Sequence, residues 1–232
     1  MEDSGTANKR AFFGVLAIAT FGLMIYLAFS STTPAQQQGS AVSAGHQNTN
    51  KSAEQQFAPP PTDDLQMIGV FNSQVLQILH ESEAATTQYQ KASKRAINNG
   101  DQMSLYTAAN AYREQIQMIG ASADEVGTPP LSVAGWHDGL SKTKDMLKES
   151  IKAKLYVAQK LEAMANGDDL KPSDLKTMKD MSEFANIRAA TTIVMAAGPL
   201  MAMGYETDDI NMKTLMPKRG RKPSKAMPDQ AG

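Results

Sequence analysis

The chain contains no cysteine and few aromatic residues, and neither sign of charge prevails. Without cysteine no disulfide can staple the fold and no cysteine-linked lipid anchor can form, so a folded domain must rest on packing alone. Aromatic residues make up 6 % of the chain, hydrophobic residues 41 %, and the formal net charge is -1. A sequence of 232 residues with this composition fits one modest domain.

Motifs for catalysis are missing as well. The sequence has three histidines and contains no nucleophile elbow, phosphate-binding loop, zinc-protease helix or dinucleotide-binding turn. The nearest approach to a carboxylate metal site is His80-Glu81-Ser82-Glu83, which is reversed and single, so we interpret it as a solvated helix face. We interpret Trp136-His137-Asp138, in an expected interhelical loop, as a cover for one end of a helical domain. We therefore expect no enzymatic activity, no cofactor and no metal.

An uninterrupted apolar run from Ala11 to Phe29 is the most informative feature that is present. At about 1.5 Å per residue it spans roughly 28 Å, close to the roughly 30 Å hydrocarbon core of a bilayer. Lys9-Arg10 precedes the run and no charge follows it until Lys51, so the positive-inside rule places residues 1–10 in the cytoplasm. We expect a single transmembrane anchor in the bacterial inner membrane with the main domain in the periplasm; a cleaved signal peptide is the alternative.

Residues 30–61 change to Gln, Ser, Asn, Gly, Ala and Thr, with almost nothing to bury. They end in Pro59-Pro60-Pro61, which favours polyproline II. We expect a linker that is flexible at first and stiffer just before the folded domain.

Residues 62–205 carry the pattern of an all-α domain. Thr62-Asp63-Asp64 is a helix start, and turn residues at 98–100, 127–130 and 166–169 divide the segment into four helices. Short joints predict an antiparallel four-helix bundle, and a coiled-coil-like domain that pairs with another copy is the alternative. Apolar residues spaced by three and four predict the packing seam, which includes Ile68, Phe71, Val75, Ile78, Tyr89, Ile116, Ile119, Leu147, Ile151 and Leu155.

The end of the fourth helix is apolar on all sides. Residues 189–205 carry no charge and contain Gly198-Pro199. Such a segment is either a fully buried helix or a second membrane span, and the sequence leaves both open.

Residues 206–232 show no periodicity, and we expect a disordered basic tail. Its core, Arg219-Gly220-Arg221 followed by Lys222-Pro223, resembles the AT-hook, which lays an Arg-Gly-Arg strand in the minor groove of DNA; the hook has proline where this chain has Lys222. Since a single span leaves the tail outside the cytoplasm, we expect a solubilising tail, with contact with an anionic surface as the alternative, rather than a nucleic-acid site. The residues for that contact are Lys218, Arg219, Arg221, Lys222 and Lys225.

The order of short tip, span, tether, helical domain and basic tail predicts a non-enzymatic scaffold or assembly component of a bacterial envelope complex, of the secretion or conjugation type. Its expected partners are the membrane and other protein subunits, with a homo-oligomer left open, and no small-molecule substrate is evident. The first alternative is a two-span sensor domain that acts through a partner chain. A structural membrane protein of a phage or mobile element is a weaker alternative.

Overall fold

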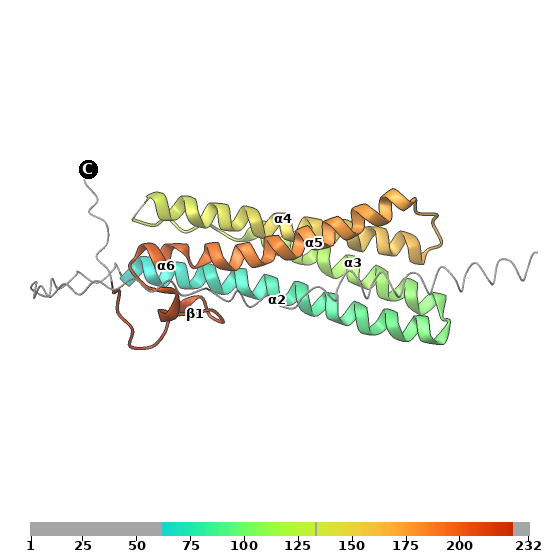
Figure 1. Cartoon of the computed structure of the whole chain (residues 1–232), viewed down its shortest axis with the longest axis horizontal. Coiled ribbons are helices and arrows are strands. Elements are labelled where there is room, and N and C mark those ends of the chain that lie inside the picture. Colours follow the sequence, from blue (N-terminus) through green and yellow to red (C-terminus); the bar gives the residue numbers. More distant parts are fainter. Residues whose placement is uncertain (1–61, 133, 225–232) are drawn as a thin grey trace, which may run out of the picture.

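Four long helices pack into an all-α bundle, as the sequence predicts. The structure is a computed structural model that describes residues 62–132 and 134–224. The helices are α2 (Thr62–Asn99), α3 (Gln102–Glu125), α4 (Ala134–Ala165) and α5 (Pro172–Ala196), and they run side by side in alternating directions (Figure 1). The predicted anchor and linker, residues 11–29 and 30–61, lie outside the described residues. Within residues 62–132 and 134–224, no helix combines the length and the hydropathy that a bilayer crossing requires.

Local chemistry explains where the helices begin and end. Gly100 takes a φ of 64° and closes α2, a left-handed conformation that glycine adopts without strain. Asp101 then caps α3, accepting a hydrogen bond of 3.0 Å from the Ser104 backbone N–H. Gly167, with a φ of 94°, ends α4 in the same way, and Pro172 begins α5 where its missing N–H costs no helical bond. The joints are therefore short, which keeps consecutive helices antiparallel.

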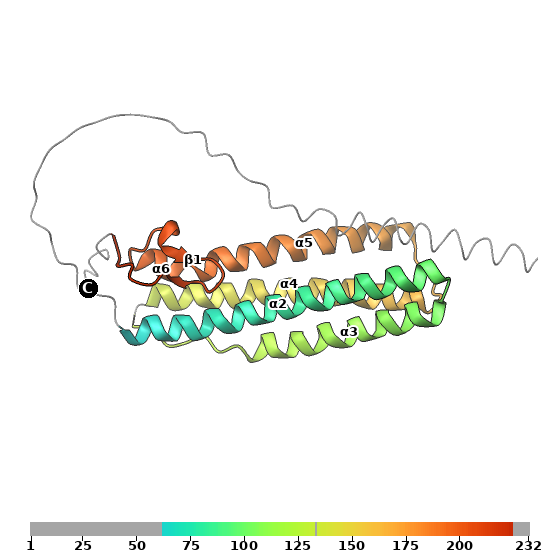
Figure 2. The same ribbon diagram turned by 90° about the horizontal axis from the view of Figure 1, so that it is seen from below.

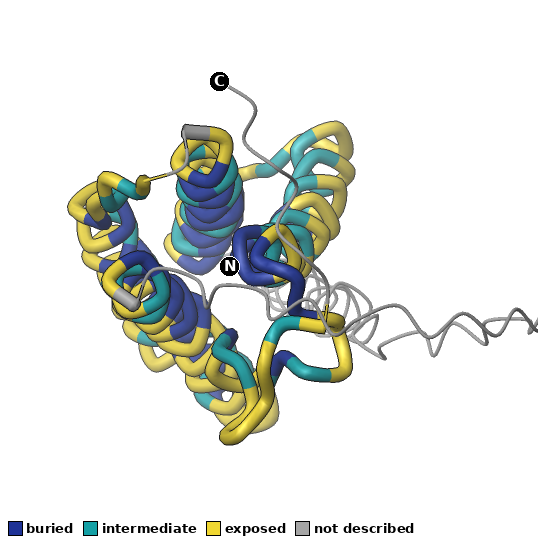
Figure 3. Tube along the Cα trace, turned by 90° about the vertical axis from the view of Figure 1, so that its left-hand side faces the viewer, coloured by how far each residue is buried: buried dark blue, intermediate teal, exposed yellow. Residues whose placement is uncertain are grey.

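The predicted seam positions lie at the centre of the bundle. Nine of the ten are buried: Ile68, Phe71, Val75, Ile78, Tyr89, Ile116, Ile119, Leu147 and Ile151. Leu155 is only half-buried, because α4 packs against both α3 and α5 and so has two buried faces, on which Val157 and Ala158 are the neighbouring buried residues. Figure 3 shows the buried positions turned toward the bundle axis.

The bundle is not evenly closed. Consecutive helices pack along their lengths, whereas α2 and α5 meet at only a few positions. Figure 2 shows α5 lying over α4, with α2 and α3 forming the other side of the bundle. One long side of the bundle, between α2 and α5, is consequently the least tightly packed.

The fourth helix is interrupted, contrary to the single helix expected up to residue 205. α5 ends at Ala196, and the short α6 (Gly198–Ala202) contains Pro199. Proline lacks the N–H that a continuing helix needs, so the chain breaks just before it. Leu200 is buried but Val194 and Met201 are exposed, so this apolar segment is buried on one side only.

The expectation of disorder from Glu206 onward is wrong for residues 206–224. A 3₁₀ turn (η1, Thr207–Asp209) leads into a two-stranded antiparallel hairpin of β1 (Ile210–Asn211) and β2 (Met216–Pro217). Tertiary contacts hold it: Ile210 and Leu215 are buried, and the side-chain amide of Asn72 on α2 donates a 2.8 Å hydrogen bond to the Leu215 carbonyl. This hairpin lies against the side of α2, near the end of the bundle where α2 begins (Figure 1).

Candidate functional site

A groove of about 380 Å³ opens between α2 and α5, on the least tightly packed side of the bundle. The helix α5 presents small side chains to it, among them Ser182, Ala185 and Ala189. Small residues opposite the larger Leu76 and Leu79 of α2 leave the space unfilled. The floor comes from α3 and α4, so all four long helices contribute to this groove.

Lys154, on α4, is the principal charged group of the groove, and sequence reasoning missed it. Its ammonium donates a 2.9 Å hydrogen bond to the Ser82 hydroxyl, which in turn donates a 2.8 Å bond to the Leu79 carbonyl. Among the described residues, Lys154 forms no ion pair. Burial lowers the pKa of Lys154 to about 8, against the opposing effect of the negative charge of Glu83.

Two stacked tyrosines lie beside the groove and stabilise the α2–α3 pair. The rings of Tyr89 and Tyr112 are 5.0 Å apart and nearly parallel, at 17°. The Tyr112 hydroxyl lies 3.2 Å from the Thr86 hydroxyl, whereas the buried Tyr89 hydroxyl has no hydrogen-bond partner within the described part of the chain. Burial raises the pKa of Tyr112 to about 12 and raises that of Tyr89 further. Both rings therefore stay neutral at physiological pH.

The Ser82 hydroxyl is not placed to act as a nucleophile. A lysine beside a serine can activate the hydroxyl, but Ser82 is fully buried and its proton is directed at the Leu79 carbonyl. Within the described part of the chain, no three His, Cys, Asp or Glu side chains gather as a metal site. What the groove offers chemically is a positive charge at the bottom of a largely apolar channel.

The helix face at residues 80–83, predicted to be solvated, is only partly exposed to solvent. His80, Glu81 and Glu83 are exposed, and His80 and Glu83 form the rim of the groove, whereas Ser82 is buried beneath them. Trp136 is buried in the core as expected of a cover, but it lies in the first turn of α4 rather than in a loop. Neighbouring His137 and Asp138 are exposed to solvent.

A second site is an apolar face of α5 that no other described residue covers. Phe184, Ile187 and Val194 are 37 %, 64 % and 62 % exposed, and with Thr191 they follow the three-and-four spacing of a heptad seam. We call these four residues the α5 stripe. The Arg188 guanidinium lies 4.9 Å from the centroid of the Phe184 ring, within cation–π distance.

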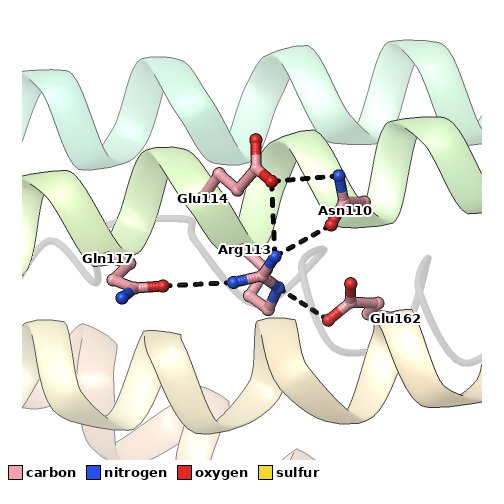
Figure 4. Close-up of polar contacts among 5 residues, drawn as sticks. All are labelled: Asn110, Arg113, Glu114, Gln117 and Glu162. Atoms are coloured by element: carbon pink, nitrogen blue, oxygen red, sulfur yellow. Dashed lines mark hydrogen bonds and ion pairs between the residues drawn. The ribbon is translucent and has the colours of Figure 1, made fainter.

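The most extensive polar network of the bundle, centred on Arg113, links α3 to α4. Arg113 Nε lies 2.7 Å from Glu162 Oε2, while its other nitrogens donate to Gln117 at 3.1 Å and Asn110 at 2.9 Å (Figure 4). Glu114 completes the group at 3.4 Å. Every charge in this network has a partner, so we interpret it as a link between helices rather than as a binding site.

The residues predicted to contact an anionic surface differ in whether they already have partners within the chain. Lys218 and Arg221 are held locally: Lys218 Nζ donates to the Asp208 carbonyl at 2.6 Å, and Arg221 Nε lies 3.3 Å from Asp209 Oδ1. Arg219 and Lys222 are exposed, and Lys225 lies outside the described residues.

The backbone around Gly220 is not the extended strand of an AT-hook. Gly220 takes a φ of 82°, and the Arg221 N–H donates a 3.0 Å bond to the Lys218 carbonyl. This geometry is a turn, in which the two arginines do not lie along one extended strand.

Compared with known protein families, curated proteins and solved structures, the chain matches none of them. The groove and the α5 stripe are the features of the described fold that bear on its function.

Proposed function

We propose that the chain is a non-enzymatic, membrane-anchored periplasmic scaffold of a bacterial envelope complex, and that it assembles through the α5 stripe. The observation that carries this proposal is the exposure of Ile187 and Val194 on the helix that closes the bundle. One face of α5 already packs on α4, so the stripe is a second apolar face without a partner among the described residues. Exposed apolar residues at heptad spacing favour another helix as the partner.

The charges beside the stripe favour a second copy of the chain in parallel orientation. Phe184 and Thr191 take the first position of the heptad, and Ile187 and Val194 take the fourth. Glu183 then lies directly before a first-position residue, and Arg188 lies directly after a fourth-position residue, so both flank the seam. In a parallel pair these flanking positions face each other across the seam, five residues apart. Glu183 of one copy then meets Arg188 of the other, and the reverse pair forms by symmetry.

Parallel orientation also suits two copies that are anchored in one membrane by the predicted span, because their domains then leave the bilayer in the same direction. Arg188 Nε lies 2.8 Å from Glu149 Oε2 within its own chain. A guanidinium carries five N–H donors, so a second carboxylate can share it. A short parallel seam supplemented by the anchors is the kind of contact from which a scaffold is assembled.

Disulfide cross-linking of the full chain in native membranes tests the assembly, since the protein has no cysteine of its own. The Ile187→Cys variant places identical thiols across a parallel seam, and we expect a covalent dimer on mild oxidation. Met118→Cys is the matched control, because Met118 is equally exposed on α3, away from the stripe. Equal cross-linking of both variants, or of neither, would contradict the proposed interface.

Topology is tested separately with a membrane-impermeant maleimide on a Ser224→Cys variant in spheroplasts, with lysed cells as control. Ser224 is exposed beside the hairpin. Labelling of intact spheroplasts is the expected result for a periplasmic domain behind one span. Labelling only after lysis would place this end of the chain in the cytoplasm and overturn the proposed location.

A further inference from the structure

The scaffold function leaves the Lys154 ammonium unexplained. An ammonium has three N–H donors, and Ser82 accepts one of them. Lys154 is half-buried and forms no ion pair among the described residues. A charge withdrawn from water without a counter-charge is costly, and such groups are normally paired. The titratable groups that line the groove around it are His80 and Glu83 on α2 and Tyr112 on α3. The side chains that α5 contributes to the lining are uncharged, among them Ser182 and Asn186.

The walls of the groove define what kind of molecule fits beside this ammonium. Leu79, Val157 and Ile193 supply apolar surface from three different helices. Hydroxyl and amide side chains such as Thr86 and Asn186 lie between these apolar residues. The volume of about 380 Å³ lies at the lower end of the range of small-molecule sites, roughly 300–1,000 Å³.

We propose that the groove between α2 and α5 binds a small organic carboxylate, with the acid group at Lys154 and the apolar body between the two helices. A carboxylate supplies the missing counter-charge and accepts the remaining N–H donors, which makes a charge-assisted hydrogen bond. Cations are repelled by the same charge, and a neutral molecule leaves it unpaired. The ammonium is available for this contact at neutral pH because its pKa is about 8.

The matched probes are 4-fluorobenzoate, which has the proposed chemistry, and 4-fluorobenzamide, which has the same ring and no charge. Fluorine NMR of each probe is recorded with the full-length protein in detergent micelles, and empty micelles give the background. We expect the protein to broaden and shift the benzoate resonance at millimolar probe, with at least about tenfold weaker binding of the amide.

Two variants distinguish the contribution of the Lys154 ammonium to binding from that of the apolar channel. Lys154→Met removes the charge and keeps an apolar chain of similar length, and we expect at least about tenfold loss of benzoate affinity. Ala189→Leu narrows the channel and leaves the lysine in place, and we expect a similar loss. The control is Lys152→Met, which removes an exposed positive charge from the same helix outside the groove. Circular dichroism confirms that each variant is folded.

Each outcome bears on the proposal. Benzoate binding that Lys154→Met abolishes and Lys152→Met spares supports it. Equal binding of benzoate and benzamide, or undiminished binding by Lys154→Met, would overturn it. Displacement of benzoate by an equal concentration of inorganic phosphate would also overturn it, because the apolar body would then contribute nothing. Because none of these measurements involves the α5 stripe, the result is independent of the cross-linking experiment.

Discussion

At the scale of single residues, Lys154 shows how a half-buried charge can lower the stability of the fold. Its folded-state pKa of about 8 lies below the ordinary lysine value of about 10.4. Between these two values the unfolded chain binds the proton and the native chain does not, so the free energy of unfolding rises with pH. Below pH 8 both states are protonated and the native state bears the full desolvation cost.

We therefore expect the Lys154→Met variant to be more stable than the wild type at pH 7. Because only the wild type gains stability as the lysine loses its proton, the difference should shrink between pH 8 and about 10. Urea unfolding of both proteins at several pH values measures this, with Lys152→Met as the control for loss of a surface charge. A difference that is constant with pH would mean that Lys154 titrates as an exposed lysine.

Residue spacing predicted the core because burial follows helix periodicity. Val75 and Ile116 each belong to a series of apolar residues spaced by three and four positions. This spacing defines the buried face of each helix before any contact is known. The half-burial of Leu155 and the position of Lys154 were not predictable in this way. Both residues lie on α4, which has two buried faces, so its apolar residues do not follow a single helical spacing. The environment of Lys154 also depends on the separation of α5 from α2, which the sequence does not encode locally.

At the scale of elements, the hairpin of β1 and β2 depends on a contact with a distant part of the sequence. Gly69 of α2 makes room for it, since a Cβ there would lie 3.0 Å from the sulfur and the methyl carbon of Met216. Asn72, one turn later, donates its hydrogen bond to the hairpin from 143 residues away. Isolated apolar residues such as Ile210 and Leu215 carry no periodicity, so sequence reasoning assigned the segment to a disordered tail.

We expect Asn72→Ala to loosen the hairpin while leaving the bundle folded. The Leu215 carbonyl loses its partner, at a cost of about 1 kcal/mol. Trypsin should then cleave faster after Lys213 and Lys218, which mass spectrometry of timed digests would detect. Gln74→Ala, an exposed change on the same helix, serves as the control. Unchanged cleavage would show that apolar contacts alone hold the hairpin.

At the scale of the whole molecule, the tyrosine stack couples bundle stability to alkaline pH. The pKa of Tyr112 is about 12 in the native state, whereas an unfolded tyrosine titrates near 10. Its contribution to stability is complete below about pH 10 and is lost as the pH rises toward 12, because the unfolded chain then gives up the proton first. The buried Tyr89 acts in the same direction.

We expect the melting temperature of the wild type to fall between pH 10 and 12 more steeply than that of Tyr112→Phe. The variant loses the contact with Thr86, so its melting temperature starts lower, but its remaining dependence on pH is smaller. Thermal unfolding followed by circular dichroism gives both curves. Parallel curves would indicate that solvent reaches the Tyr112 hydroxyl in the native state.

The hairpin packed beside the start of α2 also has a mechanical consequence. Because the described fold begins at residue 62 and ends at residue 224 near the same end of the bundle, tension applied between these two points does not run along the four helices (Figure 1). It acts first on the hairpin, whose attachment to α2 can peel away one contact at a time. Force applied between residues 62 and 224 would therefore extend the chain by the short length of the hairpin segment before it reached the helical core.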